Sequence, residues 1–321
     1  MTKFLNHLKI KNYKIKNSNR KLLVILGPTA SGKSDLAIQL AQLFNGEIIS
    51  ADSRQVYRGM DIGSGKVKIQ KSKDRSNQLY SEGIRHHVLD VANPQEYFSA
   101  AQYQKLALKA IKDIQKRGKL PILCGGTGLY LSSLIEGWQL PEVPPNPSLR
   151  AQLETESTEK LFQKLKQLDP QRAKTIDPHN KRRLIRALEI LQTKKEIPSL
   201  KKNPPPWDLL ILGIKKDQTE LKKLIKERLQ KRIQQGMIQE VENLKKQGVS
   251  SQRLEDFGLE YRWVNRYLEK KISYEEMFNS LYQDICHYAK RQMTWFKKMP
   301  KVNWVINNEE AIKLARDFLS N

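Results

Sequence analysis

Residues 27–34 read GPTASGKS and match the phosphate-loop pattern G-x-x-x-x-G-K-[ST] at every fixed position. A short apolar run at residues 21–26 precedes them, and residues 34–43 repeat apolar positions at helical spacing. Between a strand and a helix, glycines let successive N–H groups turn inward, and the helix N-terminus adds partial positive charge. Lys33 can then contact an outer phosphate, and the Ser34 hydroxyl can bind Mg²⁺.

The sequence therefore predicts a phosphate site at this loop. The pattern does not distinguish a diphosphate ester from ATP or GTP, because all three present the same oxygens. The predicted phosphate-binding residues are Gly27, Pro28, Thr29, Ala30, Ser31, Gly32, Lys33 and Ser34.

A carboxylate follows the next buried run. Residues 47–50 (EIIS) read as a second strand, and Asp52 comes directly after it in SADSRQVYRGMDIGSGK, residues 50–66. Ligands of open parallel sheets bind at the carboxyl ends of the strands. Asp52 can therefore serve as a magnesium ligand or as a general base, and the alternative is an aspartate that caps a turn.

The elements that must position these groups alternate along the chain. Helical spacing at residues 100–115 lies between the second strand and an apolar run at 120–124, and residues 209–214 form another such run. This alternation predicts an α/β fold, a P-loop NTPase-like parallel sheet flanked by helices. Long helices are expected at 219–246 and 274–298, with an edge strand at 302–306.

Two proline-rich breaks divide the chain, LPEVPPNP at residues 140–147 and NPPP at 203–206. The stretch between them looks helical and carries 14 Lys and Arg against 8 Asp and Glu. We therefore expect a discontinuous core domain at 21–140 and 208–321, and a helical insertion domain at 141–207. Residues 1–20 read as a disordered basic extension.

Composition narrows the class of protein. The formal charge is +24, which attracts polyanions, although a lysine-rich coding bias is an alternative explanation. The two cysteines, Cys124 and Cys286, stand alone without zinc-ligand spacing, and no apolar run is long enough to span a membrane. These features favour a soluble cytoplasmic protein that does not enter membranes.

Several ordered segments together resemble one family, the tRNA dimethylallyltransferases. Besides the phosphate loop and residues 50–66, they are HHVLD at 86–90, GGTGLY at 125–130, DPQRA at 169–173, RRLIRALEI at 182–190, ISYEEM at 272–277 and AKRQMTWFK at 289–297. The resemblance extends from about Lys21 to Trp304. One departure is FGLEYRW at 257–263, where the family has a Gly-Tyr-Lys/Arg-like turn.

This resemblance implies transfer of a dimethylallyl group from dimethylallyl diphosphate to N6 of the adenosine 3′-adjacent to the anticodon. It implies that Asp52 accepts the N6 proton and that Thr127 lies near the reacting centre. Together with the phosphate loop, Mg²⁺ on Ser34 and the side chain of Arg228 would take up charge on the leaving diphosphate. Arg232 lies one helical turn from Arg228 and is the alternative for this role.

The resemblance also implies a tRNA partner, bound through its anticodon stem-loop, and a monomeric enzyme. Because the target base is stacked, it must be flipped out. The implied tRNA-binding residues are Asp52, Ser53, Arg54, Gln55 and Thr127 around the base, together with Arg150, Arg182, Arg183, Leu184, Ile185 and Arg186.

A further RNA contact is suggested by the residues alone. Four cations, Lys290, Arg291, Lys297 and Lys298, bracket Trp295 and Phe296, whose rings could stack on unpaired bases. The alternative is that both aromatic residues form the apolar face of a helix.

Three other functions compete with this interpretation. One is a small-molecule or nucleotide kinase, which needs an adenine pocket and an arginine-bearing lid. Another is a prenyltransferase that acts on free adenine nucleotides, and the third is a non-catalytic RNA-binding protein. The basic stretch at 141–207 favours a polymeric RNA substrate, and an intact set of Lys33, Ser34, Asp52 and Thr127 favours catalysis.

Overall fold

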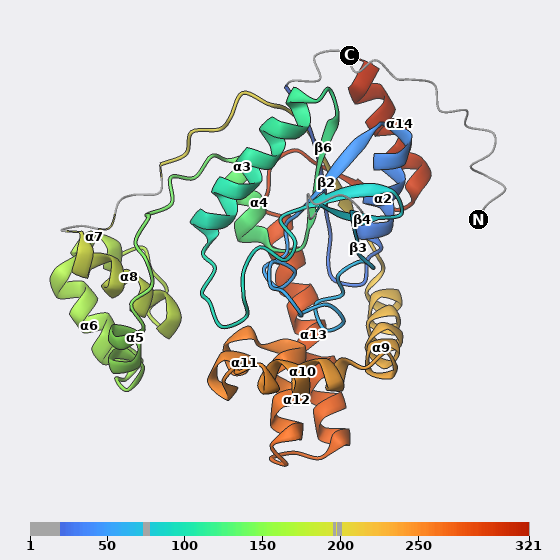
Figure 1. The fold of residues 1–321 in the computed structure, drawn as a ribbon. Coiled ribbons are helices and arrows are strands. Elements are labelled where there is room, and N and C mark those ends of the chain that lie inside the picture. The colour runs from blue at the N-terminus through green and yellow to red at the C-terminus, as the bar shows by residue number, and fades with distance from the viewer. Residues whose placement is uncertain (1–19, 73–77, 195–196, 198–200, 321) are drawn as a thin grey trace. The chain divides into compact units, whose positions relative to one another are not determined.

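The computed structural model describes residues 20–72, 78–194, 197 and 201–320 (Figure 1). The chain divides into two compact units. The first unit runs up to Ile135 and resumes at Pro205, and the second spans Glu136–Pro204. The expected basic extension at residues 1–20 lies outside the described residues, apart from Arg20.

The first unit contains an eight-stranded sheet in the order β3-β4-β5-β2-β6-β1-β7-β8. Strand β4 pairs antiparallel with both β3 and β5, and the other pairs are parallel, which confirms the predicted α/β fold. The strands are β1 Lys21–Leu26, β2 Gly46–Ser50, β3 Gln70–Lys71, β4 Leu79–Ser81, β5 Ile84–His87, β6 Leu120–Gly125, β7 Asp208–Ile214 and β8 Val302–Val305.

Helices cover both faces of this sheet (Figure 1). Side chains of a strand alternate between faces, so Leu22 and Val24 pack in one core and Leu23 and Ile25 in the other. Helices α2 and α14 cover the second of these faces, and α3, α4 and α13 the first. The helices of this unit are α2 Lys33–Leu43, α3 Ala100–Lys116, α4 Gly128–Ile135, α9 Gln218–Gln234, α10 Met237–Lys246, α11 Ser251–Phe257, α12 Leu259–Leu268, α13 Tyr274–Phe296 and α14 Asn308–Ser320.

The central strands end level with one another. Leu26 of β1 pairs with Gly125 of β6, and Ser50 of β2 pairs with Cys124 of β6. The segments that follow these three strands therefore start at the same edge of the sheet. They are the phosphate loop, the segment that begins with Ala51 and Asp52, and the glycine pair before Thr127.

The second unit is helical. Each of its helices begins at a residue whose side chain accepts a backbone N–H of the first turn, namely Asn146, Ser157, Asp169 and Asn180. Its core is formed by leucines, isoleucines and alanines of these helices. The helices are α5 Pro147–Glu154, α6 Thr158–Leu168, α7 Pro170–Ala173 and α8 Lys181–Thr193.

The single helix predicted at residues 219–246 is two helices in the structure. Residues 219–246 form α9 and α10, and the chain turns at Gly236, whose φ of 98° is a left-handed conformation that suits glycine. The sequence did not predict the short antiparallel strands or helices α11, α12 and α14. Within the described residues, none of the helices combines the length and apolar character that crossing a membrane requires.

Candidate active site

A cavity of about 630 Å³ lies at the edge of the sheet where β1, β2 and β6 end. The phosphate loop forms one wall, and Asp52 and Gln55 form another. Helix α9 contributes Arg228, and helix α13 contributes Tyr288 and Gln292. Every lining residue belongs to the first unit.

The phosphate loop is open toward this cavity. Ala30 and Gly32 adopt left-handed backbone conformations, and α2 starts after Gly32 with no side chain capping its first amides. The buried Ser31 hydroxyl has no hydrogen-bond partner among the described residues, and Lys33 donates to the carbonyl of Pro28 at 3.2 Å. Uncapped amides, an unsatisfied hydroxyl and an ammonium group together fit a phosphate ligand.

Positive charge is concentrated here. Burial lowers the pKa of Lys33, and the nearby guanidinium groups of Arg228 and Arg232 lower it further. Burial, followed by repulsion from Arg232, likewise lowers the pKa of Arg228 to about 10. Both shifts arise mainly from burial and further from neighbouring guanidinium groups, and an anionic ligand would raise both pKa values.

The structure separates the two candidate arginines of α9. Arg232 is buried and donates to Glu260 at 2.9 Å and to the carbonyl of Gly63 at 3.0 Å. Arg228 lines the cavity, and within the described part of the chain it has no hydrogen-bond or ion-pair partner. Arg228 is therefore the arginine that can bind an anion. Both guanidinium groups pack so closely on Gly65 that a side chain there would collide with them.

Asp52 lines the cavity, and Thr127 belongs to a neighbouring segment that contacts the one carrying Asp52. Asp52 Oδ1 accepts the backbone N–H of Arg54 at 2.9 Å, so this oxygen caps a turn as the alternative interpretation expected. Its other oxygen, Oδ2, has no hydrogen bond to a described residue, and Asp52 lines the cavity. Thr127 Oγ1 accepts the N–H of Ser53 at 3.0 Å, and the N–H of Thr127 donates to the carbonyl of Ala51 at 3.0 Å. The two segments are thus tied together.

Gln292 joins the phosphate loop to the segment that carries Thr127. Its Oε1 accepts the N–H of Thr29 at 2.8 Å, and its Nε2 donates to the carbonyl of Gly126 at 2.8 Å. The side chain is 6% exposed, and a Cβ at Gly126 would collide with it. We did not predict Gln292 or Tyr288. The detectable signal was their spacing of four, which places both on one face of α13.

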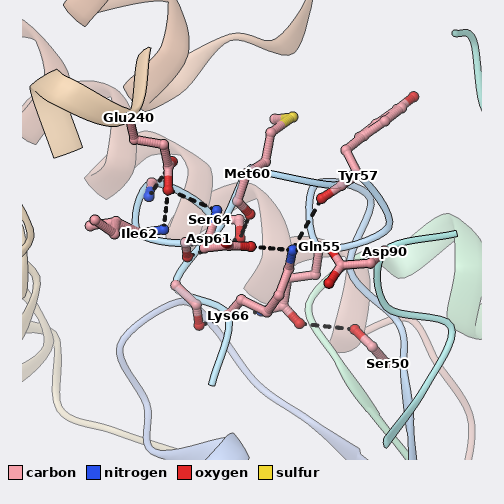
Figure 2. A network of polar contacts seen from close by, with 12 residues as sticks. Ser50, Gln55, Tyr57, Met60, Asp61, Ile62, Ser64, Lys66, Asp90 and Glu240 are labelled. Carbon is pink, nitrogen blue, oxygen red and sulfur yellow. Dashed lines mark hydrogen bonds and ion pairs between the residues drawn. The ribbon is translucent and has the colours of Figure 1, made fainter. Parts of the chain in front are cut away.

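The loop at residues 50–66 is fixed by a polar network (Figure 2). The carboxylate of Glu240, from α10, accepts three successive backbone N–H groups, those of Asp61, Ile62 and Gly63, at 2.8, 2.6 and 3.0 Å. Figure 2 also shows Lys66 beside Asp61 and Asp90, its ion-pair partners, and Gln55 bonded to Ser50. Gln55 also donates to the carbonyl of Gly65 at 3.4 Å. This network holds Gly65 against Arg228.

Arg54 is directed into the protein. Its guanidinium donates to the carbonyl of Phe257 and to the Ser53 hydroxyl, and it lies over the Phe257 ring. Phe257 and Tyr261, in the segment where the sequence departs from the family pattern, are buried in the core. Tyr261 donates to Glu240 at 3.1 Å, so this segment braces the loop at residues 50–66.

In the second unit the expected RNA-binding residues fall into different environments. Arg150 and Arg186 both pair with the buried carboxylate of Glu189. Leu184 and Ile185 are 0% and 3% exposed, and their side chains belong to the core of this unit. Arg182 and Arg183 are exposed on the first turn of α8.

The aromatic residues between the C-terminal cations do not form a stacking surface. Phe296 is 0% exposed, and Trp295 packs on Gly128 while its indole N–H donates to Ser132 at 3.1 Å. Both therefore form the apolar face of α13, as the alternative interpretation expected. The four cations, Lys290, Arg291, Lys297 and Lys298, are exposed.

The fold and the site together define a P-loop protein whose anion cavity also contains the carboxylate of Asp52, in a segment tied to Thr127. The family model described as IPP transferase matches residues 55–299. The chain belongs to this family, the tRNA dimethylallyltransferases.

Individual relatives agree. The chain is 44% identical to tRNA dimethylallyltransferase 1 of Geotalea daltonii, over 94% of this chain and 95% of that protein. The solved structure of the tRNA isopentenylpyrophosphate transferase from Bacillus halodurans is 34% identical, with a TM-score of 0.67 over 94% of this chain and 96% of that one. A eukaryotic dimethylallyltransferase acting on tRNA matches with a TM-score of 0.73 at 27% identity, over 94% and 80%.

The lowered pKa of Lys33 predicts how pyrophosphate binding depends on pH. A bound anion raises this pKa. The pKa of Lys33 in the protein without ligand lies below 10.5, and above that pKa binding must be accompanied by uptake of a proton. Affinity should be full below that value and fall above it. Calorimetric titration with pyrophosphate from about pH 7 to 10 measures this, and Lys33→Met should bind more weakly with a flatter pH profile. An unchanged profile in the variant would remove Lys33 as the titrating group.

The loop network predicts a second effect. Glu240→Ala leaves three loop N–H groups and the buried Tyr261 hydroxyl without their acceptor and should lower the free energy of unfolding by about 2–3 kcal/mol. Glu242→Ala on the same helix removes an exposed pair with Lys246 and should change it by less than about 0.5 kcal/mol. Urea unfolding compares the two, and equal losses would contradict the anchoring role of Glu240.

Proposed function

We propose that this protein transfers the dimethylallyl group of dimethylallyl diphosphate to N6 of the adenosine 3′-adjacent to the anticodon of tRNA, releasing diphosphate. One observation carries the proposal. The phosphate loop and Arg228 share a single cavity with Asp52, whose segment is tied to Thr127, so an anion site faces a proton acceptor. Family membership supports the same reaction.

The donor binds with its diphosphate on the amides that follow β1. The bond between the allylic carbon and the diphosphate oxygen breaks, and its electron pair leaves with the diphosphate. Lys33 and Arg228 face the charge that develops there, and a cavity with excess positive charge stabilises it more than it stabilises the ester.

The acceptor enters from the opposite side. An exocyclic amine of adenine is a weak nucleophile, and its nitrogen becomes acidic as it bonds to the allylic carbon. Asp52 Oδ2, which has no hydrogen bond to a described residue, takes up that proton, while Oδ1 stays fixed by the N–H of Arg54. General-base assistance of this kind typically contributes ~100 to 10,000-fold.

Magnesium fits this site through the Ser34 hydroxyl. Ser34 lines the cavity next to the phosphate loop, and the described residues contain no cluster of three acidic, histidine or cysteine side chains that could hold a metal alone. Mg²⁺ commonly takes one or two protein ligands, with substrate phosphates and water completing its shell. When bound, it supplies additional neutralisation of the diphosphate.

Transfer RNA is the proposed acceptor because the second unit, which overlaps the expected insertion at 141–207, exposes cations on a helix. Arg182 and Arg183 are exposed at the start of α8, whereas Arg150 and Arg186 pair with Glu189. Phosphate contacts of this kind offset the cost of unstacking the target base. A kinase would need a nucleotide lid, and a free-nucleotide prenyltransferase would need no such surface.

Incubation with Mg²⁺ and labelled dimethylallyl diphosphate tests the reaction. Label should enter tRNA and not AMP, and Asp52→Ala should lower the rate by ~100-fold or more while tRNA affinity stays nearly constant. Transfer of the γ-phosphate of ATP to a small acceptor would instead support a kinase. An unaltered rate in the variant would exclude Asp52 as the base.

Arg182→Ala combined with Arg183→Ala tests the RNA surface. The pair should weaken tRNA binding and reduce the slope of log affinity against log salt by about 1 to 2, because two phosphate contacts are lost. Lys290→Ala, which changes one exposed cation of α13 in the first unit, serves as a comparison. A salt slope identical to that of the unmodified protein would show that the two arginines do not contact RNA.

A further inference from the structure

A second, smaller recess lies beside the phosphate loop. Its volume is about 20 Å³, enough for one water molecule, which needs about 10–15 Å³. Four residues line both this recess and the larger cavity, namely Ser34, Gln55, Val67 and Cys124. The two spaces therefore adjoin beside Ser34. His86, from strand β5, lines the recess but not the cavity, and the proposed reaction gives it no role.

Two of the polar groups that line the recess already donate hydrogen bonds within the protein. The Ser50 hydroxyl donates to Gln55 Oε1 at 2.9 Å, and the Cys124 thiol donates to the carbonyl of Lys33 at 3.5 Å. The hydroxyl of Ser34, by contrast, has no hydrogen bond to a described residue. A small polar guest of the recess therefore meets an unused hydroxyl at the side of the cavity.

The imidazole of His86 also has one nitrogen left for a guest. Its Nδ1 lies 3.0 Å from the carbonyl of Ile84, and because a carbonyl only accepts, this nitrogen carries a proton. Burial is the main cause that lowers the pKa of His86, so the ring is neutral at about pH 7. Nε2 therefore holds a lone pair. His86 is 7% exposed, and its Nε2 has no partner among the described residues.

A neutral imidazole close to Ser34 suits a hydrated cation. Mg²⁺ takes oxygen ligands and usually keeps several waters when protein and substrate phosphates supply the remaining ligands. A water bound to a cation directs its hydrogens away from the ion, and these hydrogens need acceptors. The recess has room for one such water, and the lone pair of His86 is an acceptor that adds no positive charge.

We propose that His86 is a positioning residue for Mg²⁺, whose Nε2 accepts a hydrogen bond from a water molecule that lies in the recess and coordinates the ion held by Ser34. This inference rests on the proposed function, in which Mg²⁺ accompanies the diphosphate. His86 does not coordinate the ion itself, and its Nδ1 keeps its proton. Loss of a hydrogen-bond partner of this kind typically weakens metal binding about 10- to 100-fold.

Two substitutions separate the two ring nitrogens. The amide of asparagine reaches the position of Nδ1 only, whereas the longer glutamine brings an amide oxygen to the position of Nε2. Mg²⁺ is titrated by calorimetry into the full chain in excess over inorganic pyrophosphate, so that little pyrophosphate is free. His86→Asn should weaken Mg²⁺ binding about tenfold or more, and His86→Gln should stay within about threefold of the unmodified protein. In both, the affinity for pyrophosphate without Mg²⁺ should change by less than about twofold.

His87→Gln is the matched control. His87 is the next residue of β5, so its side chain leaves the other face of the strand, where it bonds to Glu47 at 2.7 Å. Its Mg²⁺ affinity should equal that of the unmodified protein.

Equal Mg²⁺ affinity of His86→Asn and the unmodified protein, or an equal loss in His86→Asn and His86→Gln, would overturn the inference. Pyrophosphate binding that does not depend on Mg²⁺ in the unmodified protein would do the same. Absence of dimethylallyl transfer by the unmodified protein would instead refute the proposed function. Thermal unfolding of each variant verifies that the fold is intact.

Discussion

The site depends on positive charge that the protein itself leaves uncompensated. Lys33 and Arg228 face one cavity, and burial together with repulsion from neighbouring guanidinium groups lowers the pKa of each. The electrostatic energy of the buried cations is unfavourable without an anion and becomes favourable when an anion binds. The folded protein is therefore preorganised to bind a diphosphate. Other contacts of the fold must keep these cationic side chains in position against their repulsion. The pair of Arg232 with Glu260 and the network centred on Glu240 do so on the side of α9.

Features of the site that depend on neighbouring residues could be predicted from the sequence, whereas features that depend on residues distant in the chain could not. The phosphate loop and the strands around it were predicted because glycine positions and apolar runs are read within a few residues. The choice between Arg228 and Arg232 was open, since both occupy one helix face. Glu260, 28 residues further along, decides it by pairing with Arg232.

The residues of the site that the sequence did not predict also depend on contacts between distant parts of the chain. Gln292 contacts Thr29 and Gly126, which are 263 and 166 residues away in the chain, and no local pattern announces such a contact. The suggested stacking of Trp295 and Phe296 on RNA bases was wrong for a related reason. Cations beside aromatic residues suggest RNA stacking, but helical spacing places Phe296 in the core and only the cations outside. In the second unit, likewise, the basic pattern did not separate Arg150 and Arg186, which neutralise Glu189, from surface arginines.

Helix α13 links the two halves of the proposed reaction. Gln292 contacts both the phosphate loop and Gly126 in the segment of Thr127, and Tyr288, one turn earlier, lines the same cavity as Asp52. A rigid helix carrying both contacts keeps the leaving diphosphate and the attacking amine in one geometry, which reduces the entropy lost on reaching the transition state. The apolar face of the same helix, anchored by buried Phe296, supplies that rigidity. Packing in the core of the first unit and alignment of the substrates therefore depend on one element.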